Sequence, residues 1–166
     1  DGTNTDRHTL TQTVSLGTDR TAVGITAGMY HTCVILDDGS VSCWGRNYYG
    51  ELGEGTGGDQ SEDNNQNEPT QTSSLGAGRT AIAITAGKYH TCTILDDGSV
   101  SCWGGNSYGR LGDSTTTHRY TPTPTSSLGT DRTAVAISLA DYHTCAILDD
   151  GSGSCWGQNN NGRLGD

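Results

Sequence analysis

The stretch YHTCVILDDGSVSCWG, residues 30–45, decides the fold, because it returns as YHTCTILDDGSVSCWG at 89–104 and as YHTCAILDDGSGSCWG at 142–157. Corresponding cysteines are 59 and then 53 residues apart. A period near 50 residues is typical of propellers and solenoids. The six extra residues of the first interval fall in the acidic segment 55–69, which has no hydrophobic side chain and is expected to be a solvated loop.

Each unit contains four candidate strands and shows no helical period. In the second copy these strands are expected at residues 69–73, 80–86, 89–95 and 99–104. An Asp-Asp-Gly turn separates the last two, because glycine adopts the positive φ that a tight hairpin requires. Four short strands form one propeller blade. The predicted fold class is therefore all-β, with three four-stranded antiparallel blades in units of approximately 12–70, 71–124 and 125–166.

The two ends of the chain match the middle of the unit. Residues 1–7 resemble residues 113–119, and the last four residues repeat the four at 110–113. Residues 1–11 are therefore predicted to complete the cycle of the last unit. Three blades are fewer than the four to eight of closed propellers. The ring is then partial, or it is completed by further blades of a longer protein or by a second copy.

A homo-oligomer is the simplest prediction for the open blade ends, because exposed apolar faces of that size rarely persist on monomers. We expect a dimer that forms a six-bladed ring. Its closing contact would be strand pairing near residues 8–14, with Trp156 packed across the junction. The number of blades in the full-length protein stays open, as does the question of whether the chain is a fragment.

Composition narrows the classes of partner. The formal net charge is -10 and 31% of residues are hydrophobic. An acidic surface repels phosphate backbones, so nucleic acid is not an expected partner. No stretch approaches the roughly 18 apolar residues of a membrane span, so membrane insertion is not expected either. The chain starts at Asp1 without a signal peptide and is interpreted as a mature or excised segment.

The residues that are identical in the three copies resemble a known repeat. Tyr-His-Thr-Cys, Leu-Asp-Asp-Gly and Cys-Trp-Gly-x-Asn-x-x-Gly-x-Leu-Gly are similar to the repeat of the regulator of chromosome condensation (RCC1) family. The tail of the motif, at 44–53, 103–112 and 156–165, is its most specific part. The resemblance covers essentially the whole chain except residues 55–69. The paired cysteines depart from the eukaryotic pattern of the family and resemble that of its secreted microbial members.

That resemblance implies RCC1-like β-propeller blades. Members of the family are typically seven-bladed, so three units depart from the family. They include a guanine-nucleotide exchange factor for a nuclear GTPase and a secreted bacterial inhibitor of β-lactamases. No catalytic exchange residue of the family matches a position here, so none is carried over.

The six cysteines form three pairs ten residues apart, each centred on the turn: Cys33–Cys43, Cys92–Cys102 and Cys145–Cys155. Opposed across a hairpin, each pair should have a Cα separation of roughly 4.5–5.5 Å and form a disulfide. Such bridges indicate an oxidising compartment. Zinc is the alternative, because a histidine shares the strand face of the first cysteine. Two further ligands would be needed in every unit, so the histidines are interpreted as structural hydrogen-bonding groups and no metal site is predicted.

Other repeated residues are also interpreted as scaffold. The aspartate pairs belong to turns, and the tryptophans Trp44, Trp103 and Trp156 are expected to pack between blades. Weak Ca²⁺ binding in the acidic segment stays open, although its carboxylates lack the spacing of a known calcium loop. They are Asp59, Glu62, Asp63 and Glu68. No nucleophile–base pair, phosphate loop or basic patch is present, so we predict no cofactor, no catalytic residue and no enzyme activity.

Positions that differ between the copies are better candidates for binding, because rigid scaffolds carry their binding residues in loops. Tyrosine and arginine in such loops are favoured interface anchors. The candidate binding surface consists of Arg46, Tyr48, Tyr49, Lys88 and Tyr108.

The predicted function is a secreted or cell-surface RCC1-like propeller that acts as a protein-binding module, with a protein partner of unknown identity. The alternative is a structural protein that assembles with itself. Exchange-factor activity is disfavoured by the expected disulfides and by the absence of a basic surface. A glycan-active enzyme is disfavoured because no acid pair is visible. The predicted location is extracellular or at the cell surface.

Overall fold

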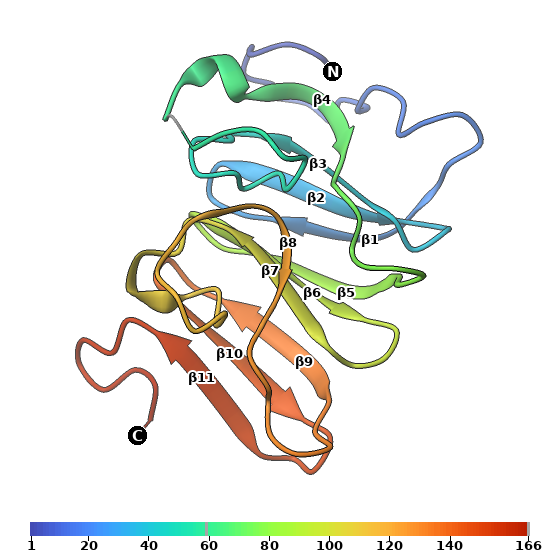
Figure 1. Cartoon of the computed structure of the whole chain (residues 1–166). Helices are drawn as coiled ribbons and strands as arrows, with labels where there is room; N and C mark the ends of the chain where they lie inside the picture. Colours follow the sequence, from blue (N-terminus) through green and yellow to red (C-terminus); the bar gives the residue numbers. More distant parts are fainter. Residues whose placement is uncertain (59, 166) are drawn as a thin grey trace.

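A computed structural model describes residues 1–58 and 60–165, so Asp59 and Asp166 lie outside the described residues. Three antiparallel sheets are stacked in chain order like successive blades (Figure 1). The first contains, in spatial order, β1 (Ala22–Ala27), β2 (His31–Leu36), β3 (Val41–Gly45) and β4 (Gln66–Gln71). The second contains β5 (Ala81–Ala86), β6 (His90–Leu95), β7 (Val100–Gly104) and β8 (Arg119–Pro124). The third contains β9 (Ala134–Leu139), β10 (His143–Leu148) and β11 (Gly153–Gly157).

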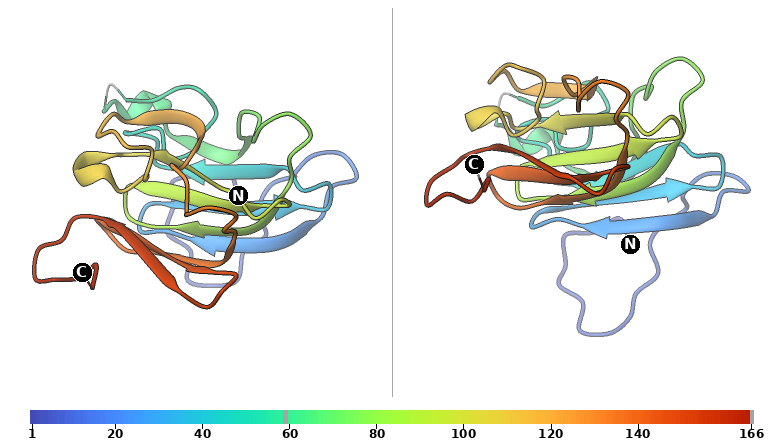
Figure 2. Two further views of the ribbon diagram at one scale, coloured as in Figure 1. Left: turned by 60° about the horizontal axis from the view of Figure 1, so that its bottom comes forward. Right: turned by 90° about the horizontal axis from the view of Figure 1, so that it is seen from below.

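The all-β, three-blade prediction is confirmed, with two differences in the outer strands. Among the described residues the third sheet has three strands instead of four, and the ring is open (Figure 2). The strand expected at residues 69–73 of the second unit belongs instead to the first blade. There β4 pairs with β3 and places Gln71 opposite Ser42, because the chain returns along β3 before it crosses to the next inner strand.

The Asp-Asp-Gly turn is confirmed in all three blades. In the first, Gly39 has φ 76° and its N–H donates to the carbonyl of Leu36. The Asp38 carboxylate accepts the backbone N–H of Ser40 at 3.0 Å. Arg20 pairs with both turn aspartates of this blade. The aspartates therefore stabilise the hairpin turn and form its ion pairs with the arginine, which we call the turn clamp.

The three predicted disulfides are confirmed. Each bridge joins residues directly opposite on the hairpin, as Cys33 lies opposite Cys43. The Cα separation is 4.1 Å in every pair, shorter than the expected range. Because every sulfur is bonded to another sulfur, the thiolate ligands that the zinc alternative needs are not available.

The core lies between the blades. At the first junction, Cys33, Cys43 and Leu52 of one blade pack with Trp103 of the next. Trp103 is fully buried and donates its indole N–H to the carbonyl of Glu51 at 2.8 Å. Trp156 takes the same place at the second junction, against the core of the second blade. It therefore cannot pack across an open junction, as was expected, because it already faces inward.

Two of the three repeated histidines, His31 and His90, are structural hydrogen-bonding groups, as predicted. His31 Nε2 lies 2.7 Å from Thr91 Oγ1, and His90 Nε2 lies 2.9 Å from Thr144 Oγ1. Each bond ties the second strand of one blade to the second strand of the next. The repeated His-Thr pair therefore holds neighbouring blades in register.

The segment 55–69 is more ordered than the solvated loop expected. It contains a short 3-10 helix, η1 (Glu62–Asn64), and the beginning of β4. Two polar contacts attach it to the first blade: the Tyr48 hydroxyl donates to Glu62 at 2.8 Å, and the Asn47 N–H donates to Asn65 at 3.0 Å. Polar anchors thus replace the apolar ones that the sequence lacks.

The first 21 residues form no strand in the described structure. Their start nevertheless repeats the local bonding of the second blade. The Thr3 N–H donates to Asp1 at 3.1 Å, as the Thr115 N–H donates to Asp113 at 3.1 Å. The predicted pairing near residues 8–14 requires a second copy and stays a prediction.

A candidate binding face with an aromatic–cationic row

Two loops after β3 and β7 form the candidate face, and buried asparagines fix both (Figure 1). Asn47 accepts the backbone N–H of Leu52 at 3.1 Å, and Asn106 accepts that of Leu111 at 2.9 Å. Both leucines are anchored in the core between blades. The residues between each asparagine and its leucine are therefore held on a short, well-defined loop, which explains the Trp-Gly-x-Asn-x-x-Gly-x-Leu pattern.

Tyrosine and arginine alternate across the three blades on this face. We call Tyr30, Arg46, Tyr89, Arg110 and Tyr142 the aromatic–cationic row. The Arg46 guanidinium carbon lies 4.0 Å from the Tyr30 ring centroid and 5.1 Å from that of Tyr89. The Arg110 carbon lies 5.3 Å from the Tyr89 centroid and 5.0 Å from that of Tyr142. These distances allow cation–π attraction, which gives the row its order.

The first arginine of the row is neutralised within its own blade. Arg46 forms an ion pair with Glu51 at 2.9 Å, and it also donates to the backbone carbonyl of Lys88 at 2.8 Å. Glu51 is fully buried. Burial raises its pKa, although the hydrogen bonds from Tyr49 and the charge of Arg46 oppose that shift.

The second arginine has a different environment. Arg110 is 2% exposed and donates to two backbone carbonyls, of Ser107 at 3.0 Å and of Asp141 at 2.8 Å. Within residues 1–58 and 60–165, no carboxylate forms an ion pair with it. Burial lowers the pKa of Arg110, yet a guanidinium stays charged at neutral pH. A buried positive charge is thus held by neutral groups.

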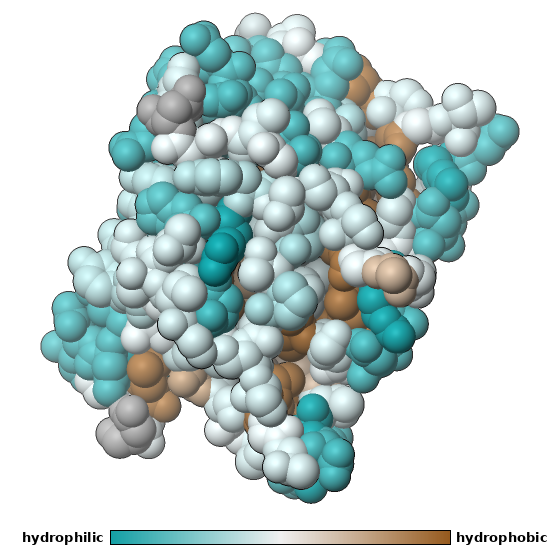
Figure 3. Space-filling model, viewed as in Figure 1, coloured by the Kyte–Doolittle hydropathy of each residue, from teal (hydrophilic) through white to brown (hydrophobic). Residues whose placement is uncertain are grey.

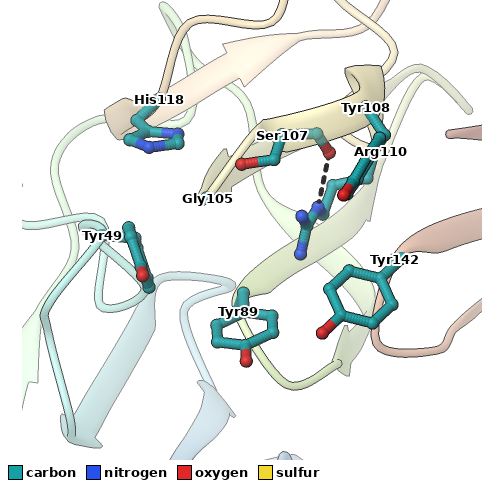
Figure 4. Close-up of a pocket in the computed structure, with 8 residues that line it drawn as sticks. All are labelled: Tyr49, Tyr89, Gly105, Ser107, Tyr108, Arg110, His118 and Tyr142. Carbon is teal, nitrogen blue, oxygen red and sulfur yellow. Dashed lines mark hydrogen bonds between the residues drawn. The ribbon is translucent and has the colours of Figure 1, made fainter. Parts of the chain in front are cut away.

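A pocket of about 200 Å³ opens beside this guanidinium (Figure 4). Its lining consists of Tyr49, Tyr89, Gly105, Ser107, Tyr108, Arg110, His118 and Tyr142. His118 Nδ1 accepts the Asn106 N–H at 2.9 Å, so the neutral ring carries its proton on Nε2. Burial, followed by the charge of Arg110, lowers the pKa of His118. The neutral ring is therefore its form at pH 7.

Tyr108 stands at the rim of the pocket with its side chain outward. Its residue is 57% exposed and its backbone is left-handed, with φ 68°. A non-glycine residue in that region costs free energy, and such residues cluster at functional sites. The Tyr108 ring meets the Tyr142 ring edge-on with centroids 6.0 Å apart. The loop therefore holds an aromatic ring in a position that a partner can reach.

The structure brings the five predicted surface residues to this one face. Tyr49 contacts Tyr89 and His118 edge-on, at centroid distances of 5.6 and 5.2 Å. Lys88 Nζ lies 5.1 Å from the Tyr89 centroid. The sequence prediction missed Tyr89 and Tyr142, because they belong to the repeated motif that was assigned to the scaffold.

Arg110 and His118 were missed as well. Arg110 stands where the other copies have Glu51 and Arg163, so the comparison of copies contained the signal. His118 offered no such signal, because its place in the pocket depends on how its loop folds back.

Outside this face the surface is largely polar in the view of Figure 3, with apolar side chains reaching it in narrow patches. The described residues contain no group of three or more His, Cys, Asp or Glu side chains placed to hold a metal. Of the carboxylates considered for Ca²⁺, Glu62 accepts the Tyr48 hydroxyl and Asp59 lies outside the described residues. No helix of the described part is long and apolar enough to cross a membrane.

Comparison with known proteins identifies the repeat. A model of the regulator of chromosome condensation (RCC1) repeat matches residues 22–51, 81–110 and 134–163, and a second with the same description matches 38–94 and 97–147. The ultraviolet-B receptor UVR8 of Arabidopsis thaliana is 34% identical over 142 residues, which are 85% of this chain and 30% of that protein. The probable E3 ubiquitin-protein ligase HERC4 of Homo sapiens is 34% identical over 143 residues, 86% of this chain and 13% of that protein.

Solved structures show the same fold. Human WBSCR16 superposes with a TM-score of 0.73 at 21% identity, over 84% of this chain and 33% of that one. Yeast RCC1 (Prp20), crystallised with Kap60, superposes with a TM-score of 0.73 at 19% identity, over 87% of this chain and 33% of that one. The chain therefore spans about a third or less of the length of these relatives. Since the repeat model matches more than half of its residues, once in every blade, the chain belongs to the RCC1 repeat family.

Proposed function

We propose that this chain is a protein-binding module that works outside the cell or at a cell surface and has no catalytic activity. The observation that carries the proposal is the aromatic–cationic row with the exposed Tyr108 beside it. Tyrosine and arginine are enriched at the energetic centres of interfaces, where rigid rings bind at a low entropy cost.

Relatives support binding as the general role. A structure of Prp20p from Saccharomyces cerevisiae was described with its binding to Gsp1p and histones, and yeast RCC1 was solved bound to Kap60. HERC4 is named as a ligase, but this chain matches only 13% of it. Support for an extracellular site, and for kinship with secreted microbial members, comes from the three disulfides, which persist in oxidising compartments.

Alanine substitution on this face tests the proposal. Proteins from the extracellular fraction of the source organism are captured on the immobilised chain, and each is then purified and titrated by calorimetry. Arg46→Ala and Tyr108→Ala should each weaken binding of a true partner by about tenfold or more. Arg132→Ala removes the turn clamp of the third blade and serves as the control. Equal affinity for all variants would place the interface elsewhere.

Self-assembly is the second candidate function, and the repeated blade junction favours it. At both junctions an alanine N–H donates at 2.8 Å to the turn glycine of the preceding blade, and a His-Thr bond lies nearby. The first blade carries the corresponding threonine, Thr32, on its outer side. The third blade carries the corresponding histidine, His143. We propose that copies join head to tail through these groups, with the segment near residues 8–14 added beside β11.

Light scattering across a dilution series tests this assembly. A dimer at high concentration that dissociates on dilution is expected, and Thr32→Val should shift the midpoint to higher concentration. A well-folded monomer at every concentration would exclude the head-to-tail arrangement.

A further inference from the structure

The pocket beside Arg110 contains a buried positive charge, and none of the carboxylates in residues 1–58 and 60–165 forms an ion pair with it. We propose that this pocket is a carboxylate-binding subsite, which takes an acidic side chain or the C-terminal carboxylate of a peptide. The inference deepens the proposed function and rests on it, because it names the chemistry of the partner.

The contrast between two equivalent positions is the first argument. In the first blade the residue that precedes the buried leucine is Glu51, and its carboxylate neutralises Arg46. In the second blade the same position is Arg110, and the position of Arg46 is occupied by Gly105. The second blade has thus replaced an internal ion pair with a lone guanidinium, and a glycine stands where the first blade has the paired arginine.

The state of the guanidinium is the second argument. Arginine has five N–H donors, and the bonds to Ser107 and Asp141 use the Nε–H and one donor of a terminal nitrogen. Those carbonyls orient the group but do not cancel its charge. A buried charge without a counterion is costly, and a carboxylate that binds it gains a charge-assisted hydrogen bond in a site from which most water is excluded.

The shape and lining of the pocket are the third argument. About 200 Å³ is several times the ~30 Å³ occupied by one water molecule, so a carboxylate with its methylene stem fits. Figure 4 shows the Arg110 guanidinium pointing between the rings of Tyr89 and Tyr142, with Tyr49 and His118 on the other side of the pocket. Ring faces suit the stem, while the guanidinium, tyrosine hydroxyls and the His118 Nε2–H are donors.

Titration of the isotope-labelled chain with small probes, followed by NMR, tests the subsite. The probes are N-acetylglutamate N-methylamide, which carries a side-chain carboxylate, and N-acetylglycylglycine, which carries a terminal one. N-acetylglutamine N-methylamide is the neutral control. Saturable shifts of the Arg110 Nε–H and the pocket tyrosines with one or both carboxylates support the proposal, and the stronger probe identifies the source. Equal shifts with the neutral amide, or none, would overturn it, as would tighter binding of inorganic phosphate.

Matched variants complete the test. Arg110→Met should weaken binding of the carboxylate probe by about tenfold or more. Arg110→Lys should weaken it by less, because lysine keeps the charge without the planar fork of donors. Arg163→Met alters the equivalent position of the third blade, outside the pocket, and should leave binding unchanged. If Arg110→Met fails to fold, the wild-type titration decides alone. If the carboxylate probes do not bind but Arg46→Ala still weakens the binding of a protein partner, this inference is refuted and the proposed function stands.

Discussion

Lowering the pH from 7 to 5 should destabilise the fold through the two histidines that join the blades. Thr91 donates its hydroxyl proton to the carbonyl of Glu51 at 2.9 Å, so it must accept from His31 Nε2. The single proton of neutral His31 is therefore on Nε2. Its Nδ1 is buried without a partner in the described structure, so a second proton would have no acceptor. Burial, assisted by the charge of Arg46, lowers the pKa of His31 from 6.5 to about 4.

The sign and size of the effect follow from proton linkage. Between pH 6.5 and about 4 the unfolded chain binds a proton at His31 that the folded chain does not, so stability falls as the pH falls. At pH 5 the loss is about 2 kcal/mol for this residue, from ~1.36 kcal/mol per pKa unit. His90 has the same arrangement with Thr144, and burial lowers its pKa well below 6.5. His90 and His118, whose pKa burial also lowers, therefore add to the loss, whereas the raised pKa of Glu51 acts in the opposite direction.

Urea unfolding at pH 7, 6 and 5, followed by tryptophan fluorescence, measures this loss. The fall of about 2 kcal/mol from His31 alone is already a large part of the 5–15 kcal/mol that domains possess. His31→Gln should remove that part of the pH dependence, whereas His8→Gln, in the exposed N-terminal segment, should leave it intact. Equal unfolding free energies at pH 7 and pH 5 would refute the assigned tautomers and their burial.

Three substitutions test other parts of the scaffold. Thr91→Val keeps the shape but leaves the buried His31 Nε2–H without an acceptor, whereas the Glu51 carbonyl keeps its bond from the Trp103 indole. Urea unfolding should therefore show a loss of about 1–3 kcal/mol, and no loss would disprove the bridging role of the Thr91 hydroxyl. Cys92→Ser with Cys102→Ser opens an eleven-residue loop and should cost about 3 kcal/mol, measured by urea unfolding against the oxidised wild type. Gly53→Ala should lower the melting temperature more than Gly78→Ala. Both have positive φ, 71° and 69°, but only the first places its Cβ 2.7 Å from a tryptophan nitrogen. Equal effects would mean that backbone strain alone matters.

The fold was predictable because its decisive signals are local. The Asp-Asp-Gly turn fixes the register of each hairpin, and that register brings Cys33 opposite Cys43 without any knowledge of the rest of the chain. The position of β4 in the sheet was harder to predict from the sequence. Its sequence does not say which neighbour it pairs with, since that depends on how the acidic segment returns along β3.

The candidate face was predictable only in part, for a physical reason. Residues that vary between copies pointed to Arg46 and Tyr108, but a pocket is formed by varied and repeated residues together. Tyr89 and Tyr142 occupy the same repeat position, each in its own blade. They become part of a site only because Arg110 lies between them. Spatial neighbours from different repeats therefore decide what a repeated side chain does.

This dependence explains how a nearly identical unit can serve different purposes along one chain. The first blade junction must keep its histidine, threonine and tryptophan, because each of them satisfies a group on the adjacent blade. The residue before the buried leucine contributes its carbonyl to that junction, while its side chain extends towards the face. It can change from Glu51 to Arg110 because the junction uses only its backbone. A position whose backbone is structural and whose side chain is unconstrained is where a repeat protein can change its ligand without loss of its fold.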